Sequence, residues 1–266
     1  MNVFQAIFLG VLQGLTEFLP VSSSAHLALA PWLFGWRDPG LAFDVALHLG
    51  TLVAVLWFFR SEWALLFRQA LRILRTRRVT TPEQKRVLFL ILATIPGGIA
   101  GVLFAHYAET AFRSPALIAT TLIVMGVLLW AVDRWVVDRW SLDEMRWTQA
   151  LVIGCAQAFA IIPGVSRSGS TITAGRALGF HRESAAVFSF LLSMPITAAA
   201  AAKEVPAALH EHGLSLNLLV GVIASAVSGW LAISVLLKYV ARHSYGIFAL
   251  YRILLGAIVL AVFALR

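Results

Sequence analysis

The fold is decided by a stretch that reads Gln13-Gly-Leu-Thr-Glu17-Phe-Leu-Pro20-Val-Ser-Ser-Ser-Ala-His26. It carries a carboxylate into an apolar run, breaks at a proline, and continues with three hydroxyls and an imidazole. Later in the chain a second stretch repeats this plan and reads Gln157-Ala-Phe-Ala-Ile-Ile-Pro163-Gly-Val-Ser-Arg167-Ser-Gly-Ser-Thr171. Polar groups are costly to bury in lipid-like surroundings. The two stretches therefore predict one functional site, for which the rest of the chain is a scaffold.

The composition is that of an integral membrane protein. Of the 266 residues, 60% are hydrophobic and 13% are charged, whereas soluble domains are typically about 45–50% apolar and about 25% charged. The net charge of +8 is concentrated in residues 60–86, which hold seven Arg and one Lys against Glu62 and Glu83. A basic cluster in a short loop between apolar segments indicates the cytoplasmic side of a membrane. We therefore expect the lipid bilayer, and no nucleic acid, as the partner.

Six apolar runs are long enough to cross a bilayer of about 30 Å as helices. They lie at approximately 43–60, 87–105, 113–132, 184–202, 216–237 and 248–265. Two further runs, 3–19 and 148–162, end at a proline and are followed by hydroxyl residues. Because broken backbone at membrane depth is tolerated where protein buries it, we interpret both as re-entrant helical hairpins. An ordinary seventh span over 3–19 is the alternative.

This interpretation predicts two equivalent halves within a single membrane domain, residues 1–266. Each half, 1–132 and 148–266, contains one re-entrant hairpin and three spans. An odd number of spans places the halves in opposite orientations, so that the hairpin tips meet near the middle of the membrane. The sequence thus predicts an all-α polytopic membrane protein built as an inverted repeat.

The residues after each proline are suited to binding an anion. Runs of Ser, Gly or Thr before a new apolar segment are typical of a helix N-terminus, where unpaired N–H groups and the helix dipole favour negative charge. Arg167 lies at one of these breaks, and its planar guanidinium can hold two phosphate oxygens. The sequence therefore predicts a phosphate cradle. For Ser24, Ser170 and Thr173 the alternative of simple helix capping stays open.

The first stretch adds ionisable groups. Gln13 and Glu17 are four residues apart, so a helix places them on one face. Of the thirteen acids, Glu17 and Asp44 are the two that fall well inside predicted membrane segments. A carboxylate there needs a cation, and a hard divalent metal shared with phosphate oxygens is suited to that place. Arg167 or His26 would be the alternative partner of Glu17.

A serine and a histidine also share the first stretch. His26 follows Ser22 by four residues and Ser23 by three, so either hydroxyl can lie on its helical face. Serine beside histidine beside carboxylate is an arrangement for nucleophilic attack with assistance from a base. The serine–histidine pair alone is not specific, and the predicted phosphate cradle opposite it is what supports a role in catalysis. His48, on the span after Asp44, ranks second to His26.

These residues carry a resemblance to a known family. The two stretches Gln13–His26 and Pro163–Thr171 resemble the signatures of the bacterial undecaprenyl-diphosphate phosphatases, the bacitracin-resistance family. Phe43–Thr51 and Phe188–Pro195 also match it, so the resemblance covers nearly the whole chain. It implies a multi-pass hydrolase of the bacterial inner membrane that converts a polyprenyl diphosphate to the monophosphate and thereby recycles the cell-wall lipid carrier. It also implies an inverted repeat with two re-entrant hairpins.

The resemblance also assigns roles to residues. It places Ser23 at the nucleophile position, His26 at the acid–base position and Arg167 at the phosphate-binding position. The expected substrate-binding residues are Gln13, Ser22, Ser24, Gly164, Ser166, Ser168 and Thr171. The family's first signature begins with Glu or Gln. Here that residue is Gln13, so Glu17 would supply the carboxylate of a site for a divalent cation, Mg²⁺ or Ca²⁺.

A different class of function shares this layout. Inverted repeats with broken helices are also found in transporters, so a transporter that flips a polyprenyl phosphate is the alternative to the enzyme. Release of inorganic phosphate from the diphosphate distinguishes the two. A homodimer is compatible with the sequence, and no residue pattern predicts it.

Overall fold

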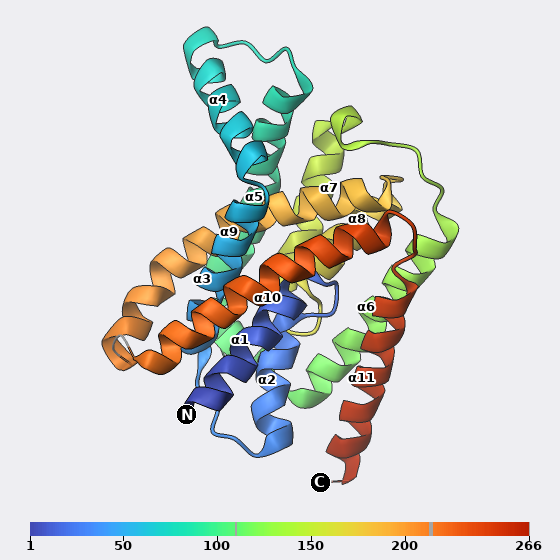
Figure 1. Ribbon diagram of the computed structural model, residues 1–266. Helices are drawn as coiled ribbons and strands as arrows, with labels where there is room; N and C mark the ends of the chain where they lie inside the picture. The colour runs from blue at the N-terminus through green and yellow to red at the C-terminus, as the bar shows by residue number, and fades with distance from the viewer. Residues whose placement is uncertain (110, 213–214, 266) are drawn as a thin grey trace.

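The structure is a computed structural model that describes all residues except 110, 213–214 and 266. In the described part the chain forms eleven α-helices and three short 3-10 helices (Figure 1). The α-helices are α1 (Val3–Phe18), α2 (Ser23–Phe34), α3 (Leu41–Phe58), α4 (Arg60–Thr76), α5 (Pro82–Glu109), α6 (Pro115–Trp135), α7 (Trp147–Ala158), α8 (Arg167–Ala177), α9 (Arg182–His212), α10 (Leu216–Val240) and α11 (Gly246–Leu265). The 3-10 helices are η1 (Ala111–Arg113), η2 (Leu142–Glu144) and η3 (Phe159–Ile161).

Most of the predicted spans correspond to long apolar helices. Five helical segments among the described residues are long and apolar enough to cross a membrane, namely Pro82–Phe104, Pro115–Trp135, Arg182–Lys203, Leu216–Val240 and Gly246–Leu265. The remaining predicted span, 43–60, coincides with α3, which meets α4 at a bend of 80°. Large apolar side chains such as Val102 and Val235 remain exposed on the helix surfaces, as lipid-facing residues do. The prediction of an all-α polytopic membrane protein is confirmed.

The two runs that end at a proline form short helices. α1 has 16 residues and therefore extends about 24 Å, less than the roughly 30 Å hydrocarbon core of a bilayer. α7 has 12 residues and continues into η3. Each is followed by a break and a second short helix, α2 or α8. Both helices are thus shorter than a complete span, and the re-entrant arrangement of the two hairpins stays a prediction.

The first hairpin is fixed to the long helices by close packing. α1 lies along α10, and Gly14 faces that helix. A Cβ atom at this position would lie 2.0 Å from Ser228 Oγ and 2.4 Å from the backbone oxygen of Ser225. Only glycine permits this approach, and small residues at helix contacts are typical of membrane proteins. The polar end of α1 is therefore held on a rigid support.

The helix pairings of the two halves mirror each other. α1 of the first half packs on α10 of the second, and α7 of the second half packs on α5 of the first. The helices that follow each hairpin, α3 and α9, pack on one another, as do the last helices of the halves, α6 and α11. The first helix of each half thus packs on a long helix of the other half, which is the pattern that a two-fold repeat produces. The opposite orientation of the halves in the membrane stays a prediction.

The two breaks meet at the centre of the bundle, where Figure 1 shows the turn after α1 beside the turn before α8. The Gly164 amide donates to Ser22 Oγ at 3.1 Å, and Ser168 Oγ donates to the Leu19 carbonyl at 3.1 Å. Residues far apart in sequence thus form one polar region inside an apolar bundle.

A buried ion-pair cluster lies at the end of the second hairpin. Asp133 Oδ1 accepts from Arg176 Nε at 2.9 Å and from Arg182 Nε at 2.8 Å. Its Oδ2 accepts from the Tyr245 amide at 2.8 Å. Arg176 and Asp133 are almost fully buried. The cluster ties α6, α8 and α9 to the residue that precedes α11, and it stabilises the frame that supports the hairpins.

Candidate active site

Glu17 is the centre of the polar region. It lies in the last turn of α1 and is buried. Gln13, one turn earlier on the same face, donates its Nε2 to Glu17 Oε2 at 3.0 Å. The predicted shared face of these two residues is thus present in the structure. A carboxylate in an apolar bundle requires further donors, and these come from other helices.

The first break brings a serine to this carboxylate. After Leu19, the chain turns through Ser22, which has a φ of 76° and caps α2 by accepting from the Ala25 amide. Ser23 is therefore the first residue of α2. Its Oγ donates to Glu17 Oε2 at 2.5 Å.

The second break brings an arginine to the same carboxylate. Gly164 has a φ of 91°, and a Cβ there would lie 2.0 Å from Thr121 Oγ1. Ser166 has a φ of 70° and caps α8 by accepting from the Gly169 amide at 3.0 Å. Arg167 is the first residue of α8, and its guanidinium donates to Glu17 Oε1.

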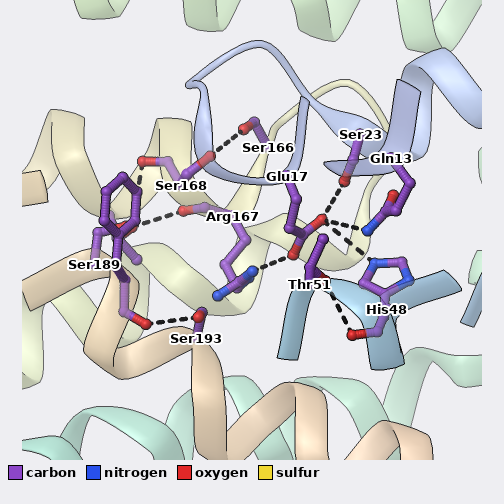
Figure 2. Close-up of polar contacts among 12 residues, drawn as sticks. Gln13, Glu17, Ser23, His48, Thr51, Ser166, Arg167, Ser168, Ser189 and Ser193 are labelled. Carbon is purple, nitrogen blue, oxygen red and sulfur yellow. Dashed lines mark hydrogen bonds and ion pairs between the residues drawn. The ribbon is translucent and has the colours of Figure 1, made fainter. Parts of the chain in front are cut away.

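Ser23 and Arg167 thus occupy the same position in two equivalent helices. Each directly follows a serine cap with a positive φ, and each contacts one oxygen of Glu17 (Figure 2). The N-termini of α2 and α8 carry unpaired N–H groups and the positive ends of the helix dipoles. The arrangement combines a hydroxyl, a guanidinium and two helix N-termini, which is a setting for a phosphate group.

A second arginine joins the two turns. Arg252 of α11 is fully buried. Its guanidinium donates to the Pro20 carbonyl at 3.1 Å and to the Gly164 carbonyl at 2.6 Å. One side chain therefore holds both breaks together. Neither motif contains Arg252, but an arginine within the predicted span 248–265 could have been recognised from the sequence as a charge that needs buried partners.

The structure does not bring His26 to Glu17. The His26 ring contacts the Ser22 carbonyl through Nδ1 and the Tyr251 hydroxyl through Nε2, both at 2.7 Å. It also stacks on the Tyr251 ring. His26 therefore connects α2 to α11 behind the hydroxyl run. Its role as an acid–base group stays a prediction.

The histidine beside Glu17 is His48 of α3. Its Nε2 lies 3.4 Å from Glu17 Oε2, and its Nδ1 lies 2.8 Å from the Asp44 carbonyl oxygen. The sequence ranked His48 second because the helical period does not reveal which residue of another helix it faces. Asp44, the other acid predicted inside the membrane, lies 3.6 Å from Arg113 and outside this group.

The remaining predicted hydroxyls divide into two sets. Ser22 and Ser24 lie 3.3 Å apart at the first break, and Ser166 and Ser168 lie 3.2 Å apart at the second. Ser24 is exposed and the other three are buried. Thr171 instead points to α9, where its Oγ1 lies 2.7 Å from Ser189 Oγ. Thr171 thus connects α8 to α9.

One side of the site opens between α3 and α9. A small pocket there is lined by both charged groups, Glu17 and Arg167, and by three hydroxyls outside the two hydroxyl runs. These are Thr51, Ser193 and Thr197. Figure 2 shows Thr51 and Ser193 on the side of the site opposite the hydroxyl runs. They are positioned to contact a ligand that enters from that side.

The residues fit a divalent cation only when a ligand supplies further oxygens. Among the described residues no three His, Cys, Asp or Glu side chains gather as a metal site. The Glu17 carboxylate is already contacted by four donors. Gln13 Oε1, however, is buried without a hydrogen-bond partner. Glu17 and Gln13 could therefore hold a hard cation whose other ligands are phosphate oxygens or water.

In the described part of the chain, five or six apolar spans surround a buried site with a serine, a carboxylate and an arginine, which defines a polytopic membrane protein whose site could take a phosphate group. The chain belongs to the family described as bacitracin resistance protein BacA, whose model matches residues 6–258. It is 63% identical to the undecaprenyl-diphosphatase of Gemmatimonas aurantiaca over all of both chains. It is 53% identical to that of Moorella thermoacetica over all of both chains, and 49% identical to that of Pelotomaculum thermopropionicum over all of this chain and 98% of the relative.

Proposed function

We propose that this chain is an undecaprenyl-diphosphatase, which hydrolyses undecaprenyl diphosphate to the monophosphate and inorganic phosphate. The observation that carries the proposal is the contact of Ser23 and Arg167, each the first residue of a helix, with the two oxygens of Glu17. The names of relatives that match over the full length support the same activity. The cellular role would be recycling of the cell-wall lipid carrier in the bacterial inner membrane.

In the proposed mechanism the terminal phosphate lies between the N-termini of α2 and α8. Arg167 and the N–H groups there stabilise its negative charge, as positioning and electrostatics dominate phosphoryl transfer. Ser23 Oγ forms a bond to the terminal phosphorus while the bond to the bridging oxygen breaks. The Ser23 proton passes to Glu17 Oε2, and the lipid monophosphate leaves. Water then hydrolyses the phosphoserine, and inorganic phosphate leaves.

Direct attack by water is the alternative within this mechanism. His26 or Glu17 would then take the proton of the water, and Ser23 would only hold the phosphate. The proposed acid–base role of His26 requires its ring to leave Tyr251, since both ring nitrogens are engaged. The loss of all turnover on removing the Ser23 hydroxyl would favour the covalent mechanism.

A divalent cation is proposed to arrive with the diphosphate. Glu17 and Gln13 would hold it together with the phosphate oxygens, and it would neutralise part of the substrate's charge. Mg²⁺ and Ca²⁺ both prefer such oxygen ligands. The polyprenyl tail would lie along the apolar outer surface of the helices. We expect no nucleic-acid partner, and a homodimer remains compatible with the chain.

Phosphate release by purified protein tests the proposal. Wild-type protein in detergent should release inorganic phosphate from undecaprenyl diphosphate with Mg²⁺ or Ca²⁺ present, and Arg167→Ala should abolish release. A folded wild-type protein that releases no inorganic phosphate would contradict the proposal. The transporter alternative predicts movement of polyprenyl phosphate across vesicles without release of phosphate, so the same preparation in vesicles distinguishes the two.

A further inference from the structure

The Glu17 carboxylate is held in one orientation from several sides (Figure 2). Its Oε1 accepts a hydrogen bond from the Arg167 guanidinium, and its Oε2 accepts one from the Ser23 hydroxyl at 2.5 Å. The same Oε2 lies 3.0 Å from Gln13 Nε2 and 3.4 Å from His48 Nε2. The two oxygens thus face different groups, and two contacts besides that of Ser23 converge on Oε2.

The orientation of the His48 ring is fixed from its own helix. Its Nδ1 lies 2.8 Å from the Asp44 carbonyl oxygen, which can only accept, so Nδ1 carries a proton. Nε2 is the atom turned to Glu17, and it donates to Glu17 Oε2 when the ring is an imidazolium with a proton on both nitrogens. The His48 side chain is 24% exposed and that of Glu17 is 5% exposed, so the contact is largely shielded from solvent. His26, by contrast, has no nitrogen left for Glu17 in this arrangement.

A different orientation of Glu17 would stop the proposed chemistry. The guanidinium of an arginine readily binds both oxygens of one carboxylate. If Glu17 rotated to give both oxygens to Arg167, its Oε2 would leave the Ser23 hydroxyl. Arg167 would then also be less free to bind phosphate. Contacts on Oε2 from the opposite side oppose this rotation, and that of His48 comes from a separate helix, α3.

The geometry points to His48 as a positioning residue for the proposed reaction. It holds Glu17 Oε2 on Ser23 and thereby leaves the Arg167 guanidinium available to the phosphate. The inference rests on the proposed phosphatase activity and adds to it a residue outside both hydroxyl runs. It also replaces His26 by His48 as the histidine that acts on Glu17.

Two variants of equal size separate this role from simple packing. Both His48→Leu and His48→Gln fill the space of the ring, but only Gln keeps an N–H group near Glu17 Oε2. We expect His48→Leu to lower kcat about 10- to 100-fold, as loss of a supporting contact or a misplacement of about 1 Å does. Because a positioning residue does not contact the substrate, KM should stay unchanged. His48→Gln should keep most of the wild-type kcat. His243→Leu, at an exposed position between α10 and α11, is the matched control and should behave as wild type.

The assay is phosphate release from undecaprenyl diphosphate, with thermal unfolding measured for each variant. If His48→Leu does not fold, His48→Met takes its place, since it also lacks a donor. A wild-type kcat in His48→Leu overturns the inference, as do equal losses in the Leu and Gln variants. A change confined to KM overturns it too, because His48 would then bind substrate. Wild-type protein without activity overturns the proposed function itself and this inference with it.

Discussion

Removal of the Arg167 guanidinium should expose how strongly the two hairpins are coupled through Glu17. The side chains of Arg167 and Glu17 are 15% and 5% exposed. Loss of one partner of a buried ion pair typically destabilises a protein by about 3–5 kcal/mol. Glu17 keeps the contacts of Ser23, Gln13 and His48, so we expect the lower end, about 3 kcal/mol, for Arg167→Met. The double variant Glu17→Gln/Arg167→Met removes both charges and should lose less than the sum of the single variants, with a coupling of about 2 kcal/mol.

Thermal unfolding in detergent measures these changes. For a chain of this size, 1 kcal/mol corresponds to about 2–4 °C, so Arg167→Met should melt about 6–12 °C below wild type. The double variant should lose about 2 kcal/mol less than the two single variants together, and it should stay inactive in phosphate release because the phosphate has lost its guanidinium. Arg167→Lys, which keeps the charge but not the planar fork, should fall between wild type and Arg167→Met in stability. A loss below about 1 kcal/mol in Arg167→Met, or strictly additive losses in the double variant, would refute the coupling.

Three further predictions concern the turn, the frame and the cation. Gly164→Ala should lower stability by more than about 2 kcal/mol and abolish activity, because a positive φ costs an L-residue about 1–2 kcal/mol and its Cβ would lie 2.0 Å from Thr121 Oγ1. Gly98→Ala, with no atom within 4 Å of its Cβ, is the control that should melt as wild type. Asp133→Asn should lower stability by about 3 kcal/mol because Arg176 loses its buried partner, whereas Asp143→Asn, 61% exposed, should change thermal unfolding little. Chelation of divalent cations should stop phosphate release and added Mg²⁺ or Ca²⁺ should restore it, and full activity in chelator would contradict a role for the cation.

The sequence predicted the elements of the site better than their assembly. Prolines followed by hydroxyls marked the two breaks, and Ser22 and Ser166 became helix caps for the local reason that the pattern implies. Glu17 and Arg167 stood out as charges in apolar surroundings, and the structure brings them into contact. The pairing itself was one of several alternatives, because spacing along one helix does not say which group of another helix lies opposite.

The histidines illustrate that limit. His26 shares a helix and a sequence motif with Ser23, which made it the expected partner. In the structure its ring turns to Tyr251 of α11, a residue more than two hundred positions away. His48 reaches Glu17 from α3 because α3 packs on α9 and lies beside α1. Long-range packing of this kind leaves no trace in the local period of either helix. Arg252 is different, since a charge within the span 248–265 could have been recognised from the sequence as requiring buried partners.

The central claim is that Ser23 attacks the terminal phosphorus in a site made by both hairpins. The most direct test uses undecaprenyl diphosphate with radioactive phosphorus in its terminal phosphate, with the reaction stopped by acid during the first turnover. The label should appear on the peptide that contains Ser23, and Ser23→Ala should show neither label nor turnover. An unlabelled wild-type protein together with full turnover in Ser23→Ala would contradict the claim.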